Sequence, residues 1–131
     1  MFDKISLIYN SASLPPRYYR NFTIELNQKE GNLKIENYSS VLVTQNFEVT
    51  EDDWKNLHQF SIDSLEKQGE KIAEGATGTH KHTIVLEEKN VEIYRMTWDS
   101  IVEINENTEK LKETIIQLIK PSLQILINET I

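Results

Sequence analysis

The sequence predicts an α+β fold, in which an antiparallel sheet of about six strands carries helices on one face. Two observations lead to this prediction. Apolar and polar residues alternate through 2–49 and again through 80–98, which is the two-residue period of half-buried strands. The three-to-four-residue period of an amphipathic helix appears at 50–65 and after 106. The expected element order is ββββαββα.

Length and composition limit the classes of function. The chain has 131 residues, which predicts a single domain spanning 1–131. Its net charge is −7, from 21 acidic and 14 basic residues, and this acidity argues against nucleic acid as a partner. The absence of cysteine excludes disulfides, zinc–thiolate sites and cysteine nucleophiles.

Neither a leader nor a membrane segment is expected. The first ten residues lack a basic region followed by a long apolar run. No apolar segment approaches the roughly 20 residues that a membrane helix needs. We therefore expect a cytoplasmic protein without a membrane partner, and the abundant Lys, Asn, Ile and Glu are typical of an AT-rich bacterial genome.

The first half of the chain predicts a four-strand meander. Strands are expected at 2–9, 17–27, 33–37 and 41–49, with a polar hairpin loop at 27–32. The residues expected to face the core are Ile5, Leu7, Tyr9, Tyr18, Phe22, Ile24, Leu26, Leu33, Ile35, Val41, Val43, Gln45, Phe47 and Val49. Between the first two strands, Pro15 and Pro16 remove backbone donors and predict an extended connector.

A helix is expected to begin after Thr50. The Thr50 hydroxyl is placed to cap the first turn, and Asp53 stands where a carboxylate reaches back. Helical spacing groups Trp54, Leu57, His58, Ser61, Ile62 and Leu65, and Gly69 suits the end of the helix. We expect Trp54, Leu57 and Leu65 to be buried against Phe22, Ile24 and Phe47.

The second half predicts a hairpin and a last helix. Strands at 80–87 and 91–98 flank a turn at 88–90, with Ile84 and Leu86 on the same face as Val91 and Ile93. Helical spacing then runs from 106 to the end of the chain and is interrupted by Pro121. Proline in a helix removes a hydrogen bond and clashes with the preceding turn, so either a kink or a break is expected.

The histidines give the only candidate metal ligands. On a strand, His80 and His82 would point to one face, as metal-binding imidazoles sometimes do, but a site would need a third ligand such as Glu74 or Glu87. The alternative is two solvated histidines at the start of a strand. His58, beside the apolar stripe of the first helix, is interpreted as a boundary residue rather than a catalyst. No metal or other cofactor is expected.

Three further segments suggest chemistry that their surroundings do not support. The glycine-rich segment 75–80 lacks the lysine of a phosphate loop. The segment 17–20 alternates arginine with tyrosine, but two arginines make a weak nucleic-acid footprint on an acidic chain. The Trp98–Ser100 segment lacks the glycine elbow of a hydrolase. No catalytic residue is therefore assigned.

The connector at 11–19 carries a resemblance. Ser11-Ala12-Ser13-Leu14-Pro15-Pro16-Arg17-Tyr18-Tyr19 resembles small uncharacterised bacterial domains in which a Ser-x-Leu-Pro-Pro connector precedes an aromatic strand. In those domains a four-strand meander leads into one helix, as expected here at 50–65. The resemblance implies no activity and no site residue. The layout is also similar to that of emfourin-like inhibitors of bacterial metalloproteases, an analogy of architecture.

The leading hypothesis is a non-catalytic domain that binds another protein or a second copy of itself. Its expected contact residues are Pro15, Pro16, Tyr19, Ile116, Leu123 and Ile127. The last three fall outside the main apolar stripe of the C-terminal helix and predict an exposed dimer patch. If Pro121 breaks the helix, each half instead turns its own apolar face inward. The competing hypothesis is a small enzyme or ligand-binding domain with a pocket between helix and sheet.

Overall fold

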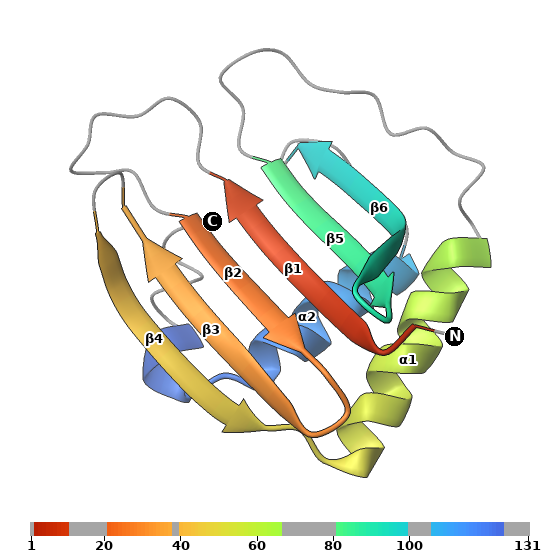
Figure 1. Cartoon of the computed structure of the whole chain (residues 1–131), viewed down its shortest axis with the longest axis horizontal. Coiled ribbons are helices and arrows are strands. Elements are labelled where there is room, and N and C mark those ends of the chain that lie inside the picture. The colour runs from red at the N-terminus through yellow and green to blue at the C-terminus, as the bar shows by residue number, and fades with distance from the viewer. Residues whose placement is uncertain (1, 11–20, 38–39, 67–80, 100–105, 125–131) are drawn as a thin grey trace.

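A computed structural model shows the expected α+β fold, a six-stranded antiparallel sheet with two helices (Figure 1). It describes residues 2–10, 21–37, 40–66, 81–99 and 106–124. The order across the sheet is β4-β3-β2-β1-β5-β6. The elements are β1 (Lys4–Asn10), β2 (Asn21–Leu26), β3 (Glu30–Glu36), β4 (Val41–Glu48), α1 (Glu51–Glu66), β5 (Lys81–Glu88), β6 (Val91–Asp99) and α2 (Glu106–Gln117).

Strand β1 lies at the centre of the sheet and joins its two parts. It pairs with β2 on one side and with β5 on the other, so that Leu7 lies between Ile24 and Ile84. Its inward side chains Ile5, Leu7 and Tyr9 have no exposed surface, as expected from the alternation. In Figure 1, α2 passes behind the sheet and packs against α1 at the lower right.

Local turn chemistry explains both tight hairpins. Between β2 and β3, the Asn27 side-chain oxygen accepts hydrogen bonds from the backbone N–H groups of Lys29 and Glu30, at 2.8 and 2.9 Å. Between β5 and β6, Lys89 and Asn90 both have positive φ, 49° and 65°. Two consecutive residues with positive φ form a type I′ turn, whose twist matches that of the two strands it joins.

Two β-bulges overturn the expected facing of several apolar residues. In β4 the register shifts: Val43 pairs with Ile35, but Val41 pairs with Glu36. Leu42, between them, has no paired residue in β3. Val41 is 48% exposed as a result and does not share the inward face of Val43. A second shift, in β6, makes Ile93 the extra residue. The core-facing partners of β5 are then Tyr94, Met96 and Trp98 rather than Val91 and Ile93.

Helix α1 begins with the expected capping box. The Thr50 hydroxyl accepts from the Asp53 N–H at 3.1 Å, and the Asp53 carboxylate accepts from the Thr50 N–H at 3.2 Å. Trp54 and Leu57 are buried in the same core as Phe22 and Ile24, with Phe47 packed against it. Leu65 was expected to join this core and Gly69 to end the helix. The Leu65 side chain and Gly69 lie outside the part of the chain that the structure describes.

Pro121 breaks the C-terminal helix, so the second of the two alternatives holds. Helix α2 ends at Gln117, and helical structure restarts at 121–124, where the Lys120 carbonyl accepts the first hydrogen bonds. Proline suits that position because the N–H it lacks would have had no helical partner.

Two residues of the expected dimer patch, Ile116 and Leu123, pack against the core. Ile116 is 7% exposed and belongs to the core, which corrects its placement at an interface. Leu123 is half-buried and packs against the same core. Ile127 lies outside the described residues. The described part of the C-terminal segment therefore serves to cover the sheet.

Replacing Leu57 should show how much the helix–sheet contact contributes. Its side chain is fully buried, so Leu57→Ala should lower the free energy of unfolding by about 2–5 kcal/mol. The neighbouring Asn56 is exposed, and Asn56→Ala should change the free energy of unfolding by less than about 0.5 kcal/mol. Urea unfolding followed by tryptophan fluorescence measures both. A cost below about 0.5 kcal/mol for Leu57→Ala would contradict this description of the core.

Gly31 is required by a contact across the β3–β4 pair. It lies opposite Phe47, and a Cβ at Gly31 would overlap the Phe47 ring. Gly31→Ala should therefore cost about 1–3 kcal/mol, because the ring has to move. In a Phe47→Leu background the same substitution should cost clearly less. Strictly additive costs in this double-mutant cycle would show that the ring does not constrain position 31.

Candidate functional site

The proposed metal ligand His82 is a core residue. Its side chain is 3% exposed, stacked on Trp98 at 5.3 Å between ring centroids and tilted against Tyr9 at 5.1 Å. The expectation of a solvated His82 is therefore wrong. His80 lies outside the described residues. Among the residues that are described, no three His, Asp or Glu side chains gather in a way that could hold a metal ion.

Aromatic side chains pack around His58 beside helix α1. His58 is half-buried and stacks on Phe2, with ring centroids 4.5 Å apart, while Trp54 meets Phe2 edge-on. Phe2 and Trp98 are themselves buried. His58 is thus a boundary residue in an aromatic cluster, and the described helix–sheet contact around it is occupied by side chains.

Several residues singled out in the sequence fall outside the part of the chain that the structure describes. They are Pro15, Pro16, Tyr19, the arginine–tyrosine segment 17–20, the glycine-rich segment 75–80 and Ser100.

One face of the sheet carries no described helix and is polar. Its residues form rows that cross all six strands. One row reads Asn46, Asn32, Glu25, Ser6, Val85, Arg95, and the next reads Thr44, Lys34, Thr23, Ile8, Thr83, Thr97. Side chains on this face bond to one another: Asn32 donates to Asn46, and the hydroxyls of Thr83 and Thr97 lie 3.0 Å apart. The composition is mostly polar, but Ser6, Thr83 and Val85 in the two central strands of this face are buried.

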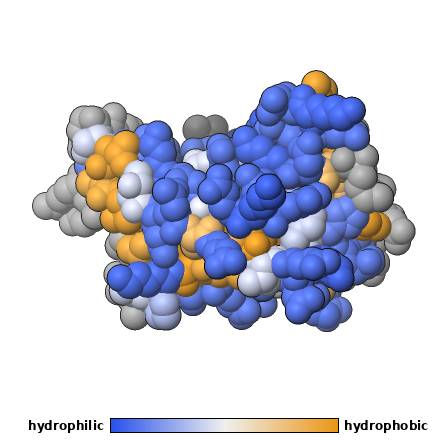
Figure 2. Space-filling view, turned by 60° about the horizontal axis from the view of Figure 1, so that its bottom comes forward, coloured by the Kyte–Doolittle hydropathy of each residue, from blue (hydrophilic) through white to orange (hydrophobic). Residues whose placement is uncertain are grey.

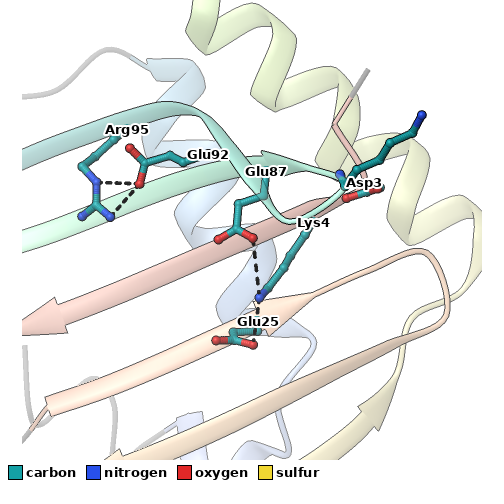
Figure 3. A network of polar contacts seen from close by, with 7 residues as sticks. Asp3, Lys4, Glu25, Glu87, Glu92 and Arg95 are labelled. Atoms are coloured by element: carbon teal, nitrogen blue, oxygen red, sulfur yellow. Dashed lines mark hydrogen bonds and ion pairs between the residues drawn. The ribbon is translucent and has the colours of Figure 1, made fainter.

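Five charged residues of this face form ion pairs with one another: Lys4, Glu25, Glu87, Glu92 and Arg95 (Figure 3). The Lys4 ammonium lies 3.3 Å from the Glu25 carboxylate and 3.8 Å from that of Glu87. Arg95 donates from Nε and Nη2 to one Glu92 oxygen, at 2.9 and 2.7 Å. The hydrogen bond from Arg95, with its positive charge, lowers the pKa of Glu92, which keeps the carboxylate ionised. A general acid would need the opposite shift.

A hollow of about 250 Å³ opens on this face beside the β2–β3 hairpin. Its lining is polar and consists mainly of Lys4, Glu25, Asn27, Glu30, Asn32 and Asn46. Lys4 already pairs with Glu25, Asn32 donates to Asn46, and the Asn27 side chain serves the hairpin turn. These interactions give Lys4, Glu25, Asn27, Asn32 and Asn46 partners within the chain.

The two edges of the sheet differ in how they are protected. Edge strands attract further strands, and natural proteins prevent this with charged side chains, proline or bulges. Strand β6 has the charged residues Glu92 and Arg95 and a bulge at Ile93. Strand β4 also has a bulge, at Leu42, but no charged residue or proline between Val41 and Phe47. Val41 and Leu42 are 48% and 42% exposed there.

Apolar residues also reach the surface on the β4 side of the molecule. Figure 2 is turned about the horizontal axis from Figure 1, so left stays left in both views. The face in Figure 2 is largely hydrophilic, but apolar residues gather at its left, on the side where Figure 1 draws β4 and the 121–124 turn.

The backbone of β4 offers hydrogen-bonding groups along its outer edge. The Val49 N–H donates to the Lys29 carbonyl at 3.1 Å, toward β3. In an antiparallel ladder the bonding side alternates from residue to residue, so Val43, Gln45 and Phe47 also bond toward β3. The N–H and C=O groups of Thr44, Asn46 and Glu48 therefore point outward. No described strand pairs with them.

This edge was not identified from the sequence. The uncharged run from Val41 to Phe47 is visible there, but an alternating apolar strand looks the same whether it lies at the centre or the edge of a sheet. Only the strand order places β4 at the edge.

Comparison with known protein families finds none that matches the chain, and comparison with curated proteins also finds no match. No helix in the described ranges has the length and apolar character needed to cross a bilayer.

The Glu92–Arg95 pair gives a titration test of the polar face. Since Arg95 lowers the pKa of Glu92, Arg95→Gln should move the Glu92 carboxyl titration to higher pH in a carbon-detected NMR experiment. The stabilisation from this pair is present above the unfolded-state pKa and is lost as pH falls through the lowered pKa. Both side chains are exposed, so Arg95→Gln should leave the thermal midpoint nearly unchanged. An unshifted titration would contradict the pairing.

Proposed function

We propose that this protein is a non-catalytic domain that binds another protein chain by accepting a strand at the outer edge of β4. The observation that carries the proposal is the uncharged edge from Val41 to Phe47 on a chain with 21 acidic and 14 basic residues. In strand addition, backbone hydrogen bonds supply affinity and the alternating side chains supply specificity. The outward N–H and C=O groups of Thr44, Asn46 and Glu48 are available for these backbone hydrogen bonds.

The chemistry of the described residues favours binding over catalysis. His82 is enclosed by aromatic rings, and His58 stacks on Phe2 at the edge of the core. Lys4, Glu25, Glu92 and Arg95 on the face without a described helix are engaged in ion pairs, and the pKa of Glu92 is lowered rather than raised. We extend the proposal to a bacterial, cytoplasmic setting, which is supported by composition and the absence of cysteine.

A display library of short extended segments tests the binding mode. The purified protein is immobilised at low density and used to select binding segments. Thr44→Pro should weaken the selected segments by about tenfold or more, because proline removes one outward donor and keeps the strand's bonds to β3. Thr44→Val, which keeps the N–H group, should bind as the wild type does.

Two results would overturn the proposal. One is a selection that yields no binding segment, or only segments that bind the Thr44→Pro variant as well as the wild type. The other is an enzymatic turnover that falls on His58→Gln or His82→Gln. Far-ultraviolet circular dichroism of each variant shows that the fold is retained.

A further inference from the structure

We propose that Met96 is a reversible oxidation site, at which a peroxide converts the thioether to a sulfoxide and weakens the contact between β6 and α2. The chain has two methionines and no cysteine, and Met96 is the methionine that lies in the described part of the chain. The site is on β6, at the opposite edge of the sheet from the strand-binding edge of β4 proposed above, and does not depend on it.

Met96 lies where the core meets the edge of the sheet. It pairs with Ile84 of β5, and its half-buried side chain packs against the core. Strand β6 is the last strand on this side, and no further described strand covers it. The side chain is therefore embedded on one side and reaches solvent on the other, which gives a small oxidant such as hydrogen peroxide a route to it.

Thr108 fixes which side of the Met96 sulfur faces the interior. Its hydroxyl donates a hydrogen bond to the Met96 Sδ at 4.0 Å, from the first turn of α2. Thr108 has no exposed surface, so the sulfur lone pair that accepts this hydrogen bond points into the protein. A thioether sulfur has a second lone pair, which remains for the oxidant.

The oxidation is an oxygen transfer in which the sulfur loses an electron pair and the peroxide gains it. The second lone pair attacks one peroxide oxygen, so that an S–O bond forms and the O–O bond breaks. The departing oxygen leaves as hydroxide and takes the proton of the transferred oxygen, and the products are the sulfoxide and water. The sulfoxide sulfur is chiral. Because Thr108 occupies one lone pair, oxygen should add mainly at the other and give one epimer.

The added oxygen changes what the contact between β6 and α2 can bury. A thioether packs as an apolar group, whereas a sulfoxide is polar. Keeping the sulfoxide oxygen away from water without a donor costs free energy, so the oxidised side chain should turn outward and withdraw from Thr108 and the core. Methionine sulfoxide reductases restore the thioether, which makes the change reversible.

Treatment of the folded chain with hydrogen peroxide tests the site. Peptide mass spectrometry should find one added oxygen at Met96. After digestion, the two methionine sulfoxide reductases, each specific for one epimer, should reduce this residue to unequal extents. A chain oxidised in urea should give nearly equal amounts of both epimers. Thr108→Val, which removes the hydroxyl, should bring the folded chain close to that ratio, and Thr108→Ser, which keeps the hydroxyl, should retain the preference.

Amide hydrogen exchange measures the effect of oxidation on the fold. Oxidation of the wild type should speed exchange in β6 by about tenfold or more, because the strand loses part of its attachment to α2. The same treatment of Met96→Leu should leave exchange in β6 within a few-fold of the untreated variant. Far-ultraviolet circular dichroism shows that each variant is folded before treatment.

Each of four results would overturn the proposal. In the first, Met96 stays unmodified in the folded chain under conditions that oxidise it in urea. In the second, the folded wild type gives equal amounts of the two epimers. In the third, oxidation leaves exchange in β6 unchanged. In the fourth, peroxide speeds exchange in Met96→Leu as much as in the wild type, which would assign the effect to another residue.

Discussion

The structure depends on the pairing of β1 with both β2 and β5. β2 follows β1 along the chain, whereas β5 begins at Lys81, so the second contact closes a long loop at an entropic cost. The side chains of Ile5, Leu7 and Tyr9 offset that cost, because all three are fully buried on the helix-covered side. Without this strand the meander β2–β4 and the hairpin β5–β6 would be separate sheets, and neither would offer the helices a complete surface.

The two bulges then shape the edges of the sheet. In each edge strand one extra residue, Leu42 or Ile93, shifts the alternation, and on β4 this exposes Val41, which a regular strand would have turned inward. On β6 the bulge also brings Glu92 and Arg95 to the same face, where they pair. On β4 no charged residue accompanies it. The same backbone irregularity therefore occurs beside charged residues on β6 and in the uncharged run Val41–Phe47 on β4.

The histidines show why residue type alone is a poor guide to chemistry. The pattern at His80 and His82 suggests imidazoles projecting together toward a ligand, but a strand has two faces and the sequence does not say which one a helix covers. His82 faces the core, stacks on Trp98 and is tilted against Tyr9. The open face instead carries threonine, asparagine and paired charges, whose contacts arise from strands far apart in the sequence.

The sequence by itself determined the elements whose causes are local. The alternation in 2–9 and 43–49, the Thr50–Asp53 capping box, the turn before Val91 and the break at Pro121 all follow from neighbouring residues. The tertiary structure decided the strand order, the positions of the bulges and the burial of Ile116. Each of these depends on contacts between segments distant in the chain. For that reason the candidate site on β4 emerged only once the strands had been placed side by side.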